Sequence, residues 1–230
     1  MYKVCCYDYL WNIIIEDMLL ELKLHLKRKL ISNGFIWKIR HYLQPSWIEN
    51  YKSKDSSRIV NKILMINPKS IIDFGCGSGN TLFKIKQSRP EIVILGIDIS
   101  SKAINFCKEL FSKNFSAGFM FKSKLNESVL KDFFEKSDSS SIDIILFDRV
   151  LYCLDYNEIG RILHLVENHT KNIIIEDFYD ENSSSYIGYK HRDWVTILRK
   201  FGFKCILNKS TQYSKVRNAN ARYMFFKKEG

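Results

Sequence analysis

The sequence predicts an α/β fold in which helices cover both faces of a doubly wound, mostly parallel sheet, and three observations support this. From residue 70 onward, short apolar segments alternate with amphipathic helical segments, as in chains that build a parallel sheet from strand–helix units. The apolar segment 142–147 is nearly continuous, which suits a strand buried on both faces. A glycine-rich turn follows the first apolar segment, 71–74, where ligands bind in such folds.

The expected elements follow one another in a regular order. Residues 8–30 form an amphipathic helix, 45–57 a polar and aromatic connector or lid, and 57–66 a second helix. The expected strands are 71–74, 92–97, 118–122, 142–147, 172–176, 205–208 and 222–226. The helices between them are 80–87, 101–111, 126–135, 156–168 and 194–201. We therefore divide the chain into a helical N-terminal extension or lid, residues 1–68, and one domain, residues 69–230.

Composition excludes several classes of protein. Of the 230 residues, 46% are apolar and 27% are charged, which is typical of a folded domain and not of a disordered chain. The six cysteines form no C-x-x-C pair, so we predict neither a disulfide framework nor a metal site. The first residues do not resemble a secretory signal, and no window is apolar enough to span a membrane. We therefore expect a cytoplasmic protein without a membrane span.

Positive charge is concentrated near the C-terminus. The net charge is +11, and residues 187–230 contain eleven Lys or Arg against two Asp or Glu. A basic region of this kind can attract nucleic acid or phosphorylated sugars. A solvated basic surface explains the same composition more simply, and no RNA-binding module is recognisable. Nucleic acid is therefore kept as an alternative partner and is not the favoured one.

A glycine-rich loop carries the strongest functional signal. Gly75, Gly77 and Gly79 allow the backbone to turn sharply and to approach a ligand closely. A dinucleotide-binding loop would need its third glycine at position 80, and a phosphate-binding loop would need a Gly-Lys-Ser/Thr sequence; neither is present. Asp73, two residues before the first glycine, suits a ligand that carries positive charge. The sulfonium and ammonium groups of S-adenosylmethionine are such charges.

A second acidic residue lies at the end of the next expected strand. Asp98 stands 21 residues beyond Gly77, about the separation expected of an acid that accepts hydrogen bonds from two ribose hydroxyls. Each signal is weak by itself. Together, in consecutive strand–loop–helix units, they predict a nucleoside-binding site.

The segments IIDFGCGSGN (71–80) and GIDIS (96–100) resemble the class I S-adenosylmethionine-dependent methyltransferases. The resemblance extends over about residues 69–228. It implies a Rossmann-like, seven-stranded sheet whose last strand is antiparallel, and this matches the strand count expected here. It also implies S-adenosyl-L-methionine as the cofactor.

The resemblance assigns roles to individual residues. Those implied to line the methionine half of the cofactor are Asp73, Gly75, Cys76 and Gly77. Asp98 would hold the ribose, and Ile99 would pack on the adenine. The family often has an acid near the adenine amino group, but the segment 121–125 lacks one, and Ser123 is the residue expected in its place.

The segment after the fourth expected strand is where the family places residues near the transferred methyl group. Asp148 and Tyr152 lie there as candidate catalytic residues, and Asp148 is expected to contact the cofactor as well. Methyltransferases that act on amino groups of nucleobases or of protein glutamine usually carry Asn/Asp-Pro-Pro-Tyr/Phe at this place, and this chain does not. A core position for Tyr152 and a helix-capping role for Asp148 are the structural alternatives.

The region after the fifth expected strand is rich in acids and tyrosines, and the family commonly forms its acceptor pocket there. A hydroxyl acceptor needs a base, because a neutral alcohol is a poor nucleophile. Histidine titrates near neutral pH, which makes His191 the candidate base. A surface histidine at the start of a helix is the structural alternative.

The leading hypothesis is an S-adenosylmethionine-dependent methyltransferase that methylates an oxygen atom of a small molecule, sugar or glycan. One alternative is an enzyme that methylates RNA or another nucleic acid. Another is a non-catalytic binding subunit that keeps the methyltransferase fold. The N-terminal helices could also pair two copies of the chain in a homodimer.

Overall fold

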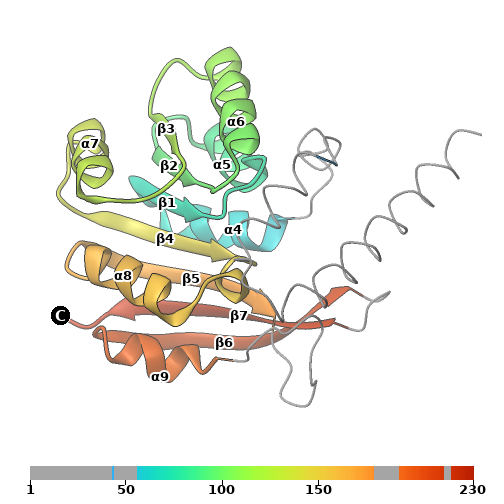
Figure 1. Cartoon of the computed structure of the whole chain (residues 1–230), viewed down its shortest axis with the longest axis vertical. Coiled ribbons are helices and arrows are strands. Elements are labelled where there is room, and N and C mark those ends of the chain that lie inside the picture. The colour runs from blue at the N-terminus through green and yellow to red at the C-terminus, as the bar shows by residue number, and fades with distance from the viewer. Residues whose placement is uncertain (1–42, 44–55, 179–191, 215–218) are drawn as a thin grey trace, which may run out of the picture.

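The structure is a computed structural model, and it describes residues 43, 56–178, 192–214 and 219–230. Its centre is a seven-stranded sheet in the order β3-β2-β1-β4-β5-β7-β6 (Figure 1). The strands are β1 (Ser70–Phe74), β2 (Val93–Ile97), β3 (Phe119–Lys122), β4 (Ile142–Asp148), β5 (Thr170–Phe178), β6 (Phe203–Ser214) and β7 (Ala219–Lys228).

Six α-helices and one short 3₁₀ turn lie in the described part of the chain. They are α4 (Ser57–Ile66), α5 (Asn80–Ser88), α6 (Ser101–Asn114), α7 (Glu127–Ser137), η2 (Leu151–Cys153), α8 (Tyr156–Val166) and α9 (Trp194–Arg199). None of these helices is both long enough and apolar enough to cross a membrane. The expected helix over 8–30, most of the expected lid and any dimer contact that they form lie outside the described residues.

Six of the seven strands run in the same direction, and only β7, the last strand of the sheet along the chain, runs against its neighbours. β1 pairs in parallel with β2 and with β4, while β3 and β5 extend this parallel sheet at either side. β7 lies between β5 and β6 and is antiparallel to both. The predicted seven-stranded, mostly parallel sheet with an antiparallel last strand is therefore confirmed.

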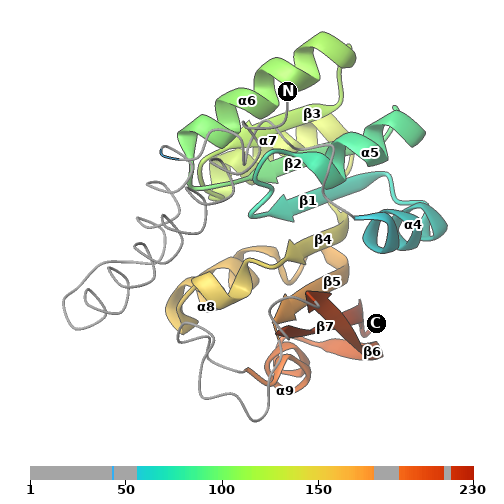
Figure 2. The same cartoon turned by 90° about the vertical axis from the view of Figure 1, so that its right-hand side faces the viewer.

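Helices cover both faces of this sheet (Figures 1 and 2). Side chains of α4, α5 and α6 pack on one face in a core that includes Ile71, while those of α7, α8 and α9 pack on the other face around Ile72. These two neighbouring residues of β1 point in opposite directions, and both are fully buried. This double burial explains why the central strands are continuous apolar segments in the sequence.

Side-chain caps fix where several helices begin. Ser100, Asn126 and Asp155 each accept a hydrogen bond from the backbone N–H three residues further along the chain. α5 begins differently, because the residue before it is Gly79 in a left-handed conformation. Glycine has no side chain, so the N-cap residue of α5 cannot accept hydrogen bonds from the first N–H groups of the helix through a side chain. This is typical of a helix whose N-terminus binds a ligand.

The two C-terminal strands are longer than the sequence predicts. β6 and β7 span 12 and 10 residues, whereas the apolar pattern indicated only 205–208 and 222–226. β6 lies at one side of the sheet as an edge strand, and β7 is the one strand that pairs with it in the described part of the chain. Its added residues are mostly polar, because an edge strand can extend its hydrogen-bond ladder without burying both of its faces.

α4 begins and ends at the residues that the sequence predicts, and its apolar face packs into the domain. Ile59, Val60 and Ile63 are buried in the same core cluster as Ile71 and Leu82. This helix is thus part of the folded body, although it precedes the division at residue 68. The division itself stays a prediction.

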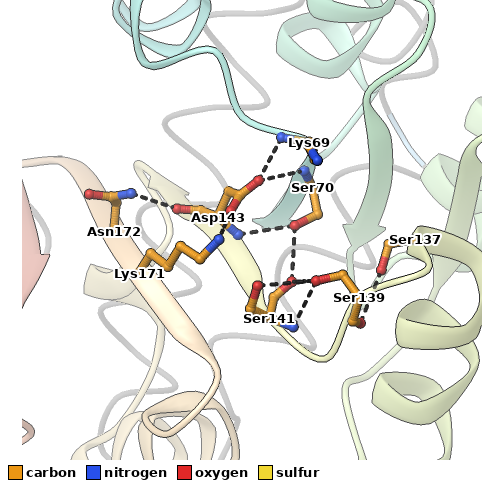
Figure 3. Close-up of polar contacts among 8 residues, drawn as sticks. All are labelled: Lys69, Ser70, Ser137, Ser139, Ser141, Asp143, Lys171 and Asn172. Carbon is orange, nitrogen blue, oxygen red and sulfur yellow. Dashed lines mark hydrogen bonds and ion pairs between the residues drawn. The ribbon is translucent and has the colours of Figure 1, made fainter. Parts of the chain in front are cut away.

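The parallel strands begin at one end of the sheet, which we call its amino edge; the end where they finish is its carboxyl edge. Asp143, near the start of β4, holds the amino edge together (Figure 3). Its Oδ2 accepts hydrogen bonds from the N–H groups of Lys69 (2.6 Å) and Ser70 (3.3 Å), and its Oδ1 accepts one from Lys171 Nζ (2.7 Å). Burial raises the pKa of Asp143, but Lys171 and the two backbone N–H groups outweigh burial, so the pKa lies below its usual range. This carboxylate joins β1, β4 and β5.

Candidate active site

The loop between β1 and α5 lies at the opposite, carboxyl edge of the sheet, and its three glycines all have a left-handed backbone. The φ angles are +72° at Gly75, +52° at Gly77 and +73° at Gly79, values that residues with a side chain rarely adopt. The N–H groups of Gly75 and Cys76 both donate to the carbonyl oxygen of Ile97, at 2.7 and 3.1 Å. These bonds hold the loop against the end of β2.

The surroundings of the glycines are partly packed and partly open. A Cβ atom at Gly75 would lie 2.6 Å from Val150 Cγ2, and one at Gly79 would lie 3.0 Å from Cys107 Sγ. A Cβ atom at Gly77 would meet no atom of the described residues within 4 Å. Gly77 therefore marks the place where the loop backbone faces open space, as a backbone that approaches a ligand must.

Asp98 connects this loop to the end of β2. Its Oδ2 accepts a hydrogen bond from the N–H of Gly77 (2.9 Å), and its Oδ1 accepts one from the N–H of Ser100 (2.8 Å). Each carboxylate oxygen can accept two hydrogen bonds, so both keep capacity for a hydroxyl group. Ile99 is 43% exposed, which leaves an apolar surface beside Asp98 for a flat ring. Ser123, after β3, is exposed as well.

Asp73 is buried beneath the loop. It is only 3% exposed, and no described residue donates a hydrogen bond to its Oδ1. Burial raises the pKa of Asp73 well above its usual range, and the negative charges of Asp148 and Asp98 raise it further. The positive charge of Arg149 opposes this shift without cancelling it. A buried polar atom without a partner costs stability, and a site for a cationic ligand explains why one stands here.

Asp148, at the end of β4, is held by the residue that follows it. Arg149 has a φ of +56°, and its Nε and Nη2 donate to the two carboxylate oxygens of Asp148 at 2.5 and 2.7 Å. The backbone N–H of Arg149 donates to the carbonyl oxygen of Glu176 (2.6 Å), which ties this turn to β5. Both oxygens of Asp148 are therefore engaged in a bidentate ion pair.

A second ion pair lies beside the first. Glu176, the register partner of Asp148, binds Arg58 of α4 through its Oε1. Burial raises the pKa of Glu176, and the charge of Asp148 adds to this, while the two arginines oppose it. Arg58 also lies over the ring of Tyr223, 5.6 Å from the centroid. Burial raises the pKa of Tyr223 to about 12, and no described residue bonds to its buried hydroxyl.

The turn after β4 is also held by Arg192, which lies shortly before α9 in the chain. Tyr152 lies in η2, and the buried Arg192 donates from Nη1 and Nη2 to the carbonyl oxygens of Leu151 and Leu154, each at 2.5 Å. The guanidinium group also lies over the ring of Tyr156, 4.7 Å from its centroid. Arg192 thus fixes the backbone on both sides of Tyr152.

The structure brings most of the predicted site residues to one edge. Those at or just beyond the carboxyl ends of β1 to β4 are Asp73, Gly75, Cys76, Gly77, Asp98, Ile99, Ser123, Asp148 and Tyr152. The Cys76 side chain is buried, and a hydrogen bond with Cys107, together with burial, raises the pKa of its thiol. Cys76 can therefore offer a ligand its backbone more readily than its sulfur. His191 lies outside the described residues.

Sequence reasoning missed three residues of this edge: Arg58, Arg149 and Tyr223. Arg149 follows a predicted site residue directly, so the charge reversal at 148–149 could have indicated the pair. Arg58 and Glu176 are 118 residues apart, and no local pattern connects them. Only the packing of α4 across the sheet brings them together.

A family model described as a methyltransferase domain matches residues 67–221. Over 109 residues the chain is 25% identical to the O-antigen chain terminator bifunctional methyltransferase/kinase WbdD of Escherichia coli. This match covers 47% of the chain and only 15% of WbdD, so the chain corresponds to a small part of that relative's length.

Solved structures show the same fold at low sequence identity. The [4+2]-cyclase SpnF has a TM-score of 0.64 at 10% identity, over 87% of this chain and 97% of that one. The N-methyltransferase NodS from Bradyrhizobium japonicum WM9, in complex with S-adenosyl-L-homocysteine, has a TM-score of 0.56 at 12% identity. That match covers 80% of this chain and 97% of NodS.

Proposed function

We propose that the acceptor is a hydroxyl group of a small molecule, sugar or glycan. The premise is that the chain belongs to the methyltransferase domain family and is an S-adenosylmethionine-dependent methyltransferase. The observation that carries this proposal is the double ion pair at the ends of β4 and β5. Asp148 with Arg149, and Glu176 with Arg58, set hydrogen-bond donors and acceptors side by side at the carboxyl edge. Such paired groups suit an acceptor rich in hydroxyls.

The residues of the loop fit the cofactor. Asp73, whose Oδ1 has no partner among the described residues, lies under the loop, and no described atom lies within 4 Å of a Cβ built at Gly77. We assign the methionine half to this part of the site, the ribose to Asp98, and the adenine to the surface between Ile99 and Ser123. When bound, S-adenosylmethionine supplies an electrophilic methyl group, and the chain's own task is to orient it and to exclude water.

One relative supports a glycan acceptor. The name of WbdD describes an O-antigen chain terminator, and this relative is 25% identical to the chain over 109 residues. The acceptor of this chain need not be the same glycan, because only 15% of WbdD is matched. We infer a hydroxylated acceptor and a cytoplasmic location, and neither depends on the remainder of WbdD.

Among the acids of the site, Glu176 is better placed than Asp148 to act as the base. Each oxygen of Asp148 already accepts a hydrogen bond from Arg149, whereas Oε2 of Glu176 has no partner among the described residues and keeps its full capacity to accept a proton. The pKa of Glu176 is also raised by its burial, which makes it a stronger base once ionised. Asp148 then holds Arg149 and the turn in place, and Tyr152 and His191 stay candidates for contact with the acceptor.

A screen of acceptors by release of S-adenosyl-L-homocysteine tests the proposal. The panel contains neutral sugars, phosphorylated sugars, lipopolysaccharide glycans, phenols and RNA, and we expect release with a hydroxylated non-nucleic-acid acceptor. Glu176→Gln should lower the rate by about 10²- to 10⁴-fold, the usual contribution of a general base. The matched control, Glu91→Gln, changes an exposed acid just before the start of β2, at the other end of that strand from Asp98, and should leave the rate unchanged.

The two alternatives predict different results in the same screen. Release with RNA alone, falling steeply as salt is raised, would indicate a nucleic-acid methyltransferase that uses the basic C-terminal region. Binding of S-adenosylmethionine without release for any acceptor would favour a non-catalytic subunit or another reaction. The cyclase SpnF shows that this fold also occurs in a protein described by a different chemistry.

A further inference from the structure

Asp73 is a carboxyl group that no protein cation neutralises in the described part of the chain. It is 3% exposed, its Oδ1 has no hydrogen-bond partner, and it forms no ion pair with a described residue. An isolated carboxylate in such a place is strongly disfavoured relative to the neutral acid. Without a bound cation, this side chain therefore favours its protonated form.

The groups around Asp73 strengthen that preference. Asp98 faces it from the end of β2, and Asp148 faces it from the end of β4. Arg149 is the nearby cation, but its Nε and Nη2 already donate to the two carboxylate oxygens of Asp148. Among the described residues, the other titratable neighbour is Cys76, a buried thiol whose pKa is raised, so that it carries no charge. Two negative charges and one already paired positive charge thus surround the carboxyl group.

A ligand with a positive charge changes this balance. The amino-acid end of S-adenosylmethionine carries an ammonium group, and we have assigned that end to the loop at Asp73. An ammonium group brought within a few ångströms of a buried carboxyl group favours the carboxylate, because the attraction is strong where water is excluded. The proton that leaves the carboxyl group passes to the solvent, so charge is conserved.

We propose that Asp73 is a proton-linked recognition residue for the cationic amino-acid end of the cofactor, neutral in the empty loop and ionised in the complex. This inference rests on the proposed function, since it takes S-adenosylmethionine as the ligand. Each bound cofactor releases up to one proton from Asp73. Affinity for the cofactor therefore rises with pH, by at most tenfold per pH unit, for as long as the empty loop holds the proton.

Calorimetry in two buffers tests the proposal without an acceptor. S-adenosyl-L-homocysteine is titrated into the full chain in phosphate and in Tris, whose ionisation enthalpies differ widely, so that the difference in heat counts the protons released. 5′-Methylthioadenosine, which keeps the nucleoside and the thioether but lacks the ammonium group, serves as the control ligand. Asp73→Asn and Asp143→Asn are the test and control variants, because Asp143 is a partly buried carboxylate at the other edge of the same sheet.

We expect the wild type and Asp143→Asn to release a proton with S-adenosyl-L-homocysteine and none with 5′-methylthioadenosine. Asp73→Asn should bind S-adenosyl-L-homocysteine at least tenfold more weakly at pH 8, with no proton release and no dependence on pH. Equal heats in the two buffers for the wild type would overturn the inference but leave the methyltransferase intact. Failure of both ligands to bind the wild type would contradict the proposed function and the inference together.

Discussion

A carboxyl group has opposite surroundings at the two edges of the central sheet, and its pKa is shifted in opposite directions. At the amino edge, Asp143 accepts hydrogen bonds from two backbone N–H groups and from Lys171, and its pKa lies below the usual range. At the carboxyl edge, Asp73 of the adjacent strand is more deeply buried, has an oxygen that no described residue bonds, and its pKa lies above the usual range. At the amino edge, Asp143 stabilises the fold. At the carboxyl edge, burial of Asp73 reduces the stability of the protein, and a ligand can supply the hydrogen-bond donor or positive charge that this carboxyl group lacks.

This difference shows that an energetically unfavourable buried group can indicate a functional site. Buried polar groups in proteins almost always have partners, so an exception at the ligand-binding end of a parallel sheet indicates a site. The same reasoning applies to the glycines. Gly75 is packed against Val150, while Gly77 faces open space. The substitutions below test this contrast in order of their expected effect on the free energy of unfolding.

Gly75→Ala should have the largest effect. The new Cβ would lie 2.6 Å from Val150 Cγ2 in a backbone with a φ of +72°, so both overpacking and backbone strain act against it. We expect a loss of about 3 kcal/mol in the free energy of unfolding, together with loss of cofactor binding. Urea denaturation measures the first and calorimetry the second. A variant with wild-type stability would show that the loop is not packed as described.

Asp143→Asn should destabilise the protein by about 2 kcal/mol near neutral pH, the usual scale for hydrogen bonds to a charged group. The pKa of Asp143 is lowered in the folded state, so its contribution is present above the ordinary pKa of an aspartate and is lost as pH falls through the folded pKa. Urea denaturation of the wild type and the variant should therefore give a difference that disappears in acid. A difference that persists in acid would mean that the charge on Asp143 is not what stabilises this edge.

Asp73→Asn should change stability in the other direction, by about 1 kcal/mol, because replacing a group kept for function commonly stabilises a protein. The pKa of Asp73 is raised in the folded state, so its contribution is present below the ordinary pKa of an aspartate and is lost as pH rises through the folded pKa. The gain from the variant should thus grow from pH 5 to pH 8 in thermal or urea unfolding. Destabilisation at pH 8 would contradict the contrast between the edges.

Gly77→Ala should change stability no more than Asp73→Asn does, but it should have a large effect on binding. Its Cβ would meet no described atom within 4 Å, so only the φ of +52° disfavours alanine, at a cost of about 1 kcal/mol. The added methyl group projects into the space assigned to the cofactor, and we expect at least a tenfold loss of affinity. Gly160→Ala, which also meets no described atom within 4 Å but lies in α8, is the matched control and should bind normally.

The sequence predicted those features that depend on neighbours along the chain. The glycine spacing, Asp98 at the end of the next strand, and the bounds of α4 could all be read from local patterns, because turns, strand ends and caps are local. The lengths of β6 and β7 could not, since an edge strand is extended by pairing and not by apolar alternation.

The acceptor side of the site depended on contacts that no sequence pattern reveals. Arg58 reaches Glu176 across 118 residues, and Arg149 folds back on Asp148 through an unusual backbone conformation. Asp148 was a reasonable candidate catalytic residue from its position, and only the geometry shows that both of its oxygens are engaged. Ion pairs of this kind are set by tertiary packing, so their partners become visible only in the folded chain.

Calorimetric titration of the wild type and of Gly77→Ala with S-adenosylmethionine and with NAD tests the central claim most directly. We predict that the wild type binds one S-adenosylmethionine per chain, that neither protein binds NAD, and that Gly77→Ala loses most of its affinity while staying folded. Binding of NAD by the wild type, or equal binding of S-adenosylmethionine by both proteins, would contradict the assignment of the loop at residues 73–79 to this cofactor.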